Sequence, residues 1–165
     1  MTYGQSLLSE FDEEMAATRR AIERVPDGHA DWKPHPKSFS LAHLTQLVAT
    51  MPGWITNMLT SPALDLAAGP GYTAQPTATL LSTFDTLVNG ARAALATARD
   101  EEMSVPWSLK HGPQVLFTMP RRDVVRQTIN HLVHHRGQLT VYLRLLDVPV
   151  PSMYGPTADE PPFGR

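Results

Sequence analysis

Four stretches of this chain carry apolar residues at every third or fourth position, and prolines separate these stretches. That spacing places the apolar side chains on one face of an α-helix. The 15 prolines fall between residues 26 and 76, from 106 to 120, and beyond 149. Because proline fixes φ and lacks an N–H donor, these groups mostly mark connections between helices. The pattern predicts several amphipathic helices joined by long, stiff connections.

The four expected helices cover residues 7–25, about 40–59, about 77–102 and 120–146. Ser38 and Ser40 are both suitable N-caps for the second helix. Pro52 lies inside that helix and should kink or interrupt it. The first helix should end at Pro26 and Gly28, since neither residue favours a helix interior.

Between the third and fourth helices, residues 105–120 read "VPWSLKHGPQVLFTMP". "HGPQ" is typical of a turn and "VLFTM" of a strand, so we expect a short hairpin or an extended flap there. After Asp147 the prolines exclude a helix, and residues 147–165 should form an extended tail over the helices. The expected fold class is all-α: a four-helix bundle in a single domain of residues 1–165.

Charge and composition exclude several classes of protein. The net charge of -2, the pI near 6.4 and the lack of a long basic run argue against a nucleic acid partner. Arginines 121, 122, 126, 136 and 144 are typical of a solvated helix face with internal ion pairs. The chain has no cysteine, so disulfides, thiolate nucleophiles and cysteine-rich zinc sites are absent.

The expected location is cytoplasmic, with no membrane association. The first residues, "MTYGQSLLSEFDEE", lack the basic and apolar regions of a signal peptide. No apolar run approaches the roughly 20 residues that span a bilayer.

The strongest candidates for a functional site are His131 and His135. Side chains four positions apart lie one turn apart on the same helix face, so both imidazoles can reach one ion. Nitrogen ligands suit zinc, nickel, copper or iron, and such ions take at least three ligands. Alternatively, both are core histidines bonded to the backbone or to hydroxyl groups.

Other residues near the pair have two interpretations. Gln138 and Tyr142 follow the histidines at helical spacing, and they either orient a ligand or only pack between helices. The three tryptophans come from connections or helix ends, and they either rim a pocket or pack in the core; they are Trp32, Trp54 and Trp107.

Two segments resemble the DinB/YfiT-like superfamily. One is the C-terminal string "HHRGQ…YLR…VP…YG…ADE", and the other is "WKPHPKSFSLAHLTQLVATMPGW". The resemblance covers about residues 5–160. It implies a bundle of up-down-down-up topology, a homodimer, and a divalent metal, with zinc or nickel as our expectation. It also implies three histidine ligands, one from the second helix and two from the fourth.

Carried over to this sequence, His131 and His135 match the pair of ligands from the fourth helix. The position of the remaining ligand is Leu47, which cannot bind a metal. His43 lies one turn earlier, about 6 Å away along the axis. Three alternatives remain: His43 replaces the missing ligand, a carboxylate or water does so, or Leu47 packs where the metal would be.

The resemblance implies a metal-dependent enzyme, either a thiol-dependent S-transferase or a hydrolase, with a degenerate metal site. A small-molecule substrate or a low-molecular-weight thiol would be its partner. The alternative is a metal-free small-molecule-binding or stress-associated protein without catalytic activity. Leu47 favours this alternative, whereas the nearly complete string on the fourth helix favours the enzyme. No catalytic residue beyond the metal ligands is assigned.

Overall fold

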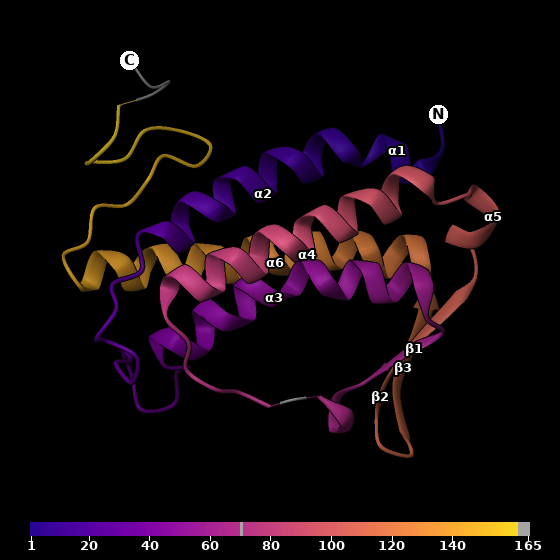
Figure 1. Ribbon diagram of the computed structural model, residues 1–165, viewed down its shortest axis with the longest axis horizontal. Helices are drawn as coiled ribbons and strands as arrows, with labels where there is room; N and C mark the ends of the chain where they lie inside the picture. The colour runs from indigo at the N-terminus through magenta and orange to yellow at the C-terminus, as the bar shows by residue number, and fades with distance from the viewer. Residues whose placement is uncertain (70, 162–165) are drawn as a thin grey trace.

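Four long helices form the body of the protein: α2 (Leu8–Glu23), α3 (Leu41–Thr60), α4 (Thr77–Thr97) and α6 (Arg121–Leu145). The computed structural model describes residues 1–69 and 71–161. In Figure 1, α2 and α6 run in one direction and α3 and α4 in the other. Helix α3 packs against both α4 and α6, and α2 packs against α4 and α6 in turn. Their apolar faces enclose one core, which includes Phe11, Leu44, Phe84 and Ile129.

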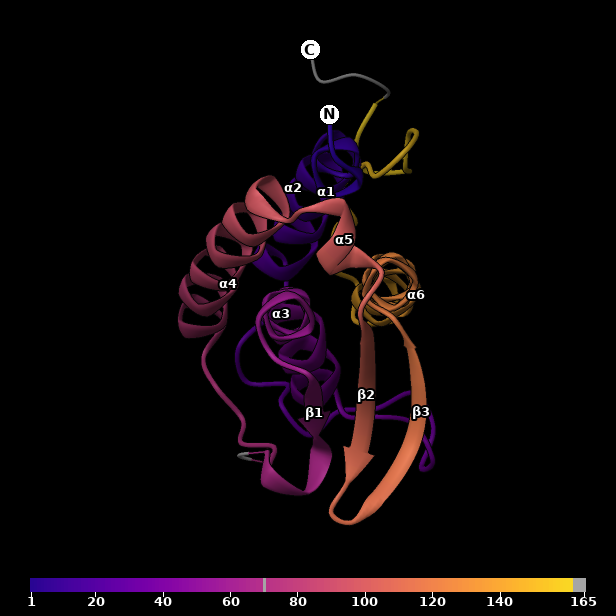
Figure 2. The same cartoon turned by 90° about the vertical axis from the view of Figure 1, so that its right-hand side faces the viewer.

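A three-stranded mixed sheet lies below α3 and α6 (Figure 2). Strands β2 (Pro106–His111) and β3 (Gln114–Pro120) form an antiparallel hairpin, so the hairpin expected before the last helix is present. Strand β1 (Ala63–Asp65) adds to β2 in parallel and leads into the short helix η1 (Leu66–Ala68). The expected all-α class is therefore wrong, because the chain after α3 supplies a third strand to the hairpin.

The helix boundaries follow local chemistry closely. Ser40 is the N-cap of α3, and its hydroxyl accepts the His43 N–H at 3.3 Å. Pro52 lies inside α3 without dividing it. Helix α4 ends at Thr97 and not near residue 102, because Ala98 is extended and a separate turn, α5 (Asp100–Met103), follows. A further short helix, α1 (Tyr3–Ser6), precedes α2. Across residues 1–69 and 71–161, none of the helices is both long and apolar enough to span a membrane.

Arg136 is buried, which corrects the expectation that the arginines of α6 form a solvated face. Its side chain is 2% exposed and forms an ion pair with Glu14 of α2 at 2.7 Å. The guanidinium also donates to the Thr18 hydroxyl and, at 2.7 Å, to the Tyr154 hydroxyl. Tyr154 in turn donates to the Glu14 carboxylate at 2.7 Å. Arg136 therefore joins α6, α2 and the tail in one network.

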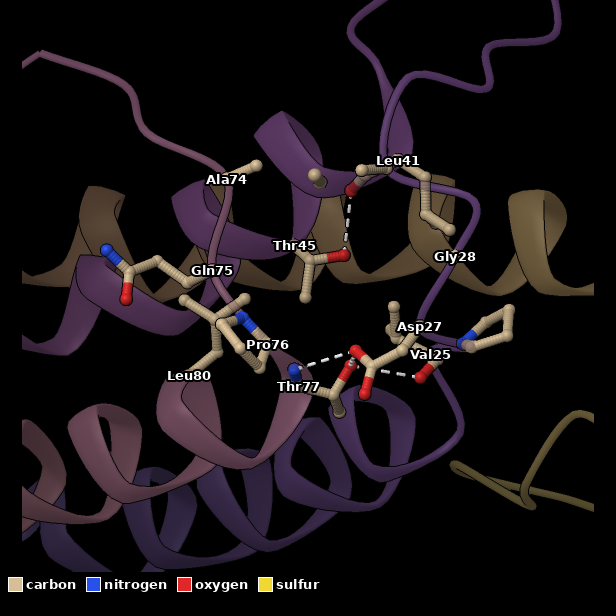
Figure 3. Close-up of a pocket in the computed structure, with 13 residues that line it drawn as sticks. Val25, Asp27, Gly28, Leu41, Thr45, Ala74, Gln75, Pro76, Thr77 and Leu80 are labelled. Carbon is tan, nitrogen blue, oxygen red and sulfur yellow. Dashed lines mark hydrogen bonds between the residues drawn. The ribbon is translucent and has the colours of Figure 1, made fainter.

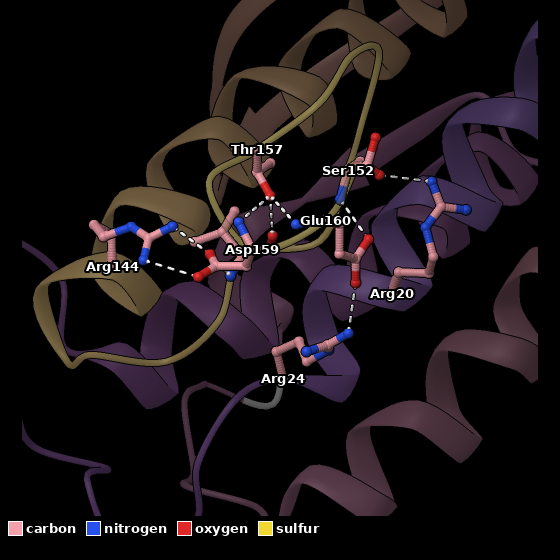
Figure 4. Close-up of polar contacts among 8 residues, drawn as sticks. Arg20, Arg24, Arg144, Ser152, Thr157, Asp159 and Glu160 are labelled. Carbon is pink, nitrogen blue, oxygen red and sulfur yellow. Dashed lines mark hydrogen bonds and ion pairs between the residues drawn. The ribbon is translucent and has the colours of Figure 1, made fainter. Parts of the chain in front are cut away.

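Residues 147–161 contain no helix, and they bend back on themselves beside α2 and α6; the rest of the expected 147–165 tail lies outside the described residues. Two carboxylates hold the tail (Figure 4). Asp159 pairs with Arg144 of α6 and accepts the Val150 N–H at 2.8 Å. Glu160 pairs with Arg24 at 2.7 Å and accepts the Ser152 N–H at 2.8 Å. Each carboxylate thus closes a loop of the tail and also fastens it to a helix.

We predict that Arg136→Leu lowers the free energy of unfolding by about 3–5 kcal/mol, because it leaves the Glu14 carboxylate without its buried partner. The double variant Arg136→Leu/Glu14→Leu should recover a large part of this loss, since neither charge then remains buried. Urea unfolding followed by circular dichroism measures both values. Equal losses in the single and double variants would contradict the assignment of the pair as the stabilising contact.

We further predict that acid releases the tail through Asp159. The hydrogen bond from Arg144, followed by that from the Val150 N–H, lowers the pKa of Asp159 below its ordinary 3.8. Because the folded-state pKa is the lower one, Asp159 stabilises the docked tail above the unfolded-state value. This contribution is lost as the pH falls through the folded-state value. The Val150 amide proton shift should titrate with a midpoint below 3.8. It should not titrate in Asp159→Asn.

Candidate functional site

The structure brings His131 and His135 into direct contact on α6. Their Nε2 atoms lie 2.8 Å apart, and their ring centroids 4.6 Å apart. His135 is 9% exposed, whereas His131 is exposed. The pair therefore lies at the boundary between the core and the solvent, with the two Nε2 atoms bonded to each other.

Gln138 connects this pair to a third histidine. Its side-chain oxygen lies 2.8 Å from His135 Nδ1, and its nitrogen lies 3.1 Å from His134 Nε2. An amide oxygen only accepts, so the proton on His135 is assigned to Nδ1. His135 Nε2 then carries a lone pair, which accepts the Nε2–H of His131. Gln138 thus directs the basic nitrogen of His135 toward His131.

The pKa of His131 is lowered, first by desolvation and then by repulsion from His135 and His134. A lowered pKa favours the neutral imidazole near pH 7. Neutral imidazole is the form that donates a lone pair to a metal or accepts a proton from a substrate.

A cavity of about 280 Å³ opens beside His131 between the helices and the sheet. We call it the sheet pocket. It is lined by α3, β1, η1, β2, β3 and α6 through Trp54, Met58, Leu64, Leu66, Trp107, Leu109, Phe117, Val124, Gln127, Thr128 and His131. The Trp54 ring centroid lies 6.1 Å from that of His131. His131 therefore forms part of the wall of a mostly apolar cavity, whereas its partner His135 does not line it.

The tryptophans divide between the two roles considered for them. Trp54 and Trp107 line the sheet pocket, and Trp107 is also 1% exposed in the core. Trp32 instead packs edge-on against Tyr142 at 5.5 Å. Sequence reasoning missed the pocket walls formed by Leu64, Leu109 and other sheet residues, since only the pairing of β1 with β2 brings them together.

His43 occupies a separate aromatic cluster at the start of α3. Its ring stacks on Tyr72 at 4.5 Å and contacts Phe39 at 4.4 Å. The Phe39 ring also lies 6.4 Å from that of His135. In residues 1–69 and 71–161, no group of three histidine, aspartate or glutamate side chains is positioned to hold a metal ion. The role of His43 as a ligand stays a prediction.

Leu47 lies on the same helix as His43 and is partly buried against the apolar core. Its side chain offers no lone pair. His131 and His135 of α6 are therefore the candidate ligands that the structure places in contact.

The two imidazoles could bind one metal ion if their Nε2 atoms moved slightly apart. Two nitrogens bound to one tetrahedral zinc at about 2.05 Å lie about 3.3 Å apart. The Nε2 atoms here are 2.8 Å apart, as a hydrogen-bonded pair requires. Side-chain rotation provides a shift of about 0.5 Å. The proton on His131 Nε2 would also have to leave that nitrogen, because a protonated ring nitrogen has no lone pair for a metal. The pair fits a two-histidine site, and the other coordination positions would be open.

A second cavity, of about 400 Å³, lies where α2 ends and α3 and α4 begin (Figure 3). Its carboxylate, Asp27, accepts hydrogen bonds from the backbone N–H and the hydroxyl of Thr77, each at 3.0 Å. These bonds lower the pKa of Asp27, the backbone bond first. Asp27 thus caps the first turn of α4, and we name this cavity the Asp27 pocket. No histidine is among the described residues that line it, so the sheet pocket is the better candidate despite its smaller volume.

Comparisons with known proteins agree on one family. The sequence model described as "DinB family" matches residues 1–162. A solved DinB-like protein, YjoA of Bacillus subtilis, has a TM-score of 0.69 at 18% identity, covering 94% of this chain and 99% of that one. A DinB-like protein of Bacillus cereus ATCC 10987 has a TM-score of 0.68 at 20% identity, covering 91% and 97%. These similarities show a shared fold.

One curated protein matches over a short segment. It is the uncharacterized protein YrdA of Bacillus subtilis strain 168, which is 43% identical over 42 residues. The matched segment is 26% of this chain and 25% of that protein. The match adds no activity or substrate.

We predict that Gln138→Leu removes the tautomer preference of His135, because the acceptor for its Nδ1–H is lost. Nitrogen-15 chemical shifts of the imidazole rings measure this directly. The wild-type protein should show the Nδ1–H form of His135, and the variant a mixture of both tautomers. Gln127→Leu, which changes a glutamine on the same helix, is the matched control and should leave His135 unchanged. A retained Nδ1–H form in Gln138→Leu would contradict the assigned role.

Proposed function

The chain belongs to the DinB family, and we propose that it is a small-molecule enzyme of the transferase or hydrolase type. In this proposal His131 and His135 hold a divalent metal, zinc or nickel. The observation that carries the proposal is the contact of their Nε2 atoms, 2.8 Å apart, where His131 borders the sheet pocket. The cavity provides a place for a substrate directly beside the ligands.

A bound divalent cation would supply the Lewis acidity that makes a water or a thiol nucleophilic near neutral pH. The chain's own residues prepare the site for it. Gln138 fixes the tautomer of His135, and desolvation keeps His131 neutral. Trp54 and Phe39 place aromatic rings beside the pair and reduce its access to water. The chain has no cysteine, so a thiol nucleophile would come from a low-molecular-weight cosubstrate.

A metal-free binding protein is the second candidate function, and Leu47 favours it. This residue stands where the resemblance implies a third ligand, and it packs against the core. Two imidazoles alone hold a metal more weakly than three ligands do. In this candidate the sheet pocket still binds a small molecule, while His131 and His135 only donate or accept hydrogen bonds.

The formal net charge of -2 favours a small molecule over a nucleic acid as the partner. Homodimer formation and a cytoplasmic location stay predictions.

We predict that protein purified without a histidine tag and stripped with a chelator binds one zinc or nickel ion, measured by calorimetric titration. His131→Ala and His135→Ala should each abolish binding, because one imidazole does not hold the ion. Leu47→His should tighten binding by roughly tenfold or more, since it restores a ligand position on α3. His43→Ala should weaken binding by a similar factor if His43 supplies the third ligand, and no change would eliminate that role.

The matched control is His111→Ala, which removes an exposed histidine of the hairpin and should leave the affinity unchanged. Circular dichroism should show the same helical content in all variants. Binding that survives both His131→Ala and His135→Ala would refute the proposed site. Absence of binding in the wild-type protein would favour the metal-free candidate.

A further inference from the structure

We propose that the sheet pocket takes an uncharged, apolar group of the substrate, about the size of two fused aromatic rings. The inference rests on the proposed function in that it names the substrate class of the same site. The substrate would place its reacting polar atom at His131 and its hydrocarbon part between α3, α6 and the sheet.

The size of the group follows from the cavity volume. The sheet pocket measures about 280 Å³. An apolar cavity of about 150 Å³ is large enough to hold benzene. The sheet pocket therefore accommodates a bicyclic or branched hydrocarbon group, but not the body of a larger substrate.

The apolar character follows from the lining. Trp107 and Phe117 place their ring centroids 6.2 Å apart, and Met58 and Val124 are 3% and 2% exposed. No charged side chain is among the lining residues in the described part of the chain. An ionised ligand group would lose its hydration there without gaining an opposite charge, and that loss disfavours binding strongly.

The deep polar groups are already bonded within the protein. The Trp107 indole N–H donates to the Asn57 side-chain oxygen at 3.3 Å. The Thr128 hydroxyl donates to the Val124 carbonyl at 2.9 Å. The Trp107 N–H and the Thr128 hydroxyl therefore need no hydrogen-bond partner from a ligand. Gln127 and His131, both on α6, are left to meet a polar atom of the substrate.

Two fluorescent probes that differ by a single sulfonate test this inference on chelator-treated protein. They are the neutral 1-dimethylaminonaphthalene and its sulfonated counterpart, 5-dimethylaminonaphthalene-1-sulfonate, both built on two fused rings. The neutral probe should bind roughly tenfold or more tightly than the anion, because the pocket cannot compensate the sulfonate charge. Since no metal is present, the result does not depend on whether His131 and His135 bind one.

Variants then locate the bound probe. Leu66→Arg adds a guanidinium at the pocket, and the ratio of affinities should shift toward the sulfonated probe by roughly tenfold. Leu116→Arg is the matched control: Leu116 is 45% exposed against 47% for Leu66, but it does not line the pocket. Leu109→Trp should block the neutral probe by filling the cavity. Ala74→Trp fills the Asp27 pocket instead and should have no effect.

Three outcomes would overturn the inference: equal affinity for both probes, no binding of either, or loss of binding in Ala74→Trp but not in Leu109→Trp. If the probe results hold while the metal titration fails, the metal-dependent function is wrong and the substrate class stands. If the metal binds but the neutral probe does not, the pocket assignment is wrong and the metal site stands.

Discussion

The buried guanidinium of Arg136 sets the orientation of α6, and the candidate site depends on that orientation. Consecutive residues of an α-helix differ by about 100° around its axis. Arg136 is held against α2 by Glu14 and Thr18. The preceding residue, His135, therefore faces a different neighbour, and its ring lies near Phe39 at the start of α3. The network around Arg136 and the imidazole pair lie on two faces of α6. A change in the network that rotates α6 would therefore also move the imidazole pair.

The C-terminal string of the family separates into two physical roles. His135 and Gln138 belong to the candidate site, whereas Arg136 and Tyr154 hold the tail on the helices. The same-face placement of the two histidines could be predicted, because helical periodicity is local. The burial of Arg136 could not be predicted from periodicity, since its partner Glu14 is 122 residues away along the chain. A solvated arginine face was the reasonable expectation from composition, and a single long-range ion pair overturned it.

Short sequence motifs predicted most helix ends, whereas the missed strand depends on pairing between distant parts of the chain. Ser40 caps α3 through its own hydroxyl, so the sequence around it suffices to place the helix start. Strand β1 has three residues and acquires its identity only by pairing with β2, which begins more than 40 residues later. No periodicity can be read from so short a strand. The all-α class failed for this reason, and with it the sequence reasoning missed the wall of the sheet pocket that carries Leu64 and Leu66.

Leu47 bears on both the candidate metal site and the sheet pocket. A histidine there would add a ligand from α3 and raise the affinity for a cation, but it would also bring a polar group to a helix that otherwise presents Trp54 and Met58 to the pocket. With leucine at this position, the polar groups of the site all come from α6: His131, His135 and Gln138. A divalent cation held there by two neutral imidazoles would keep its full charge, and the apolar surroundings would favour a ligand that neutralises it at the metal. In the proposed enzyme, Leu47 would therefore weaken the metal site and also favour a substrate with one polar reacting atom and an uncharged hydrocarbon body.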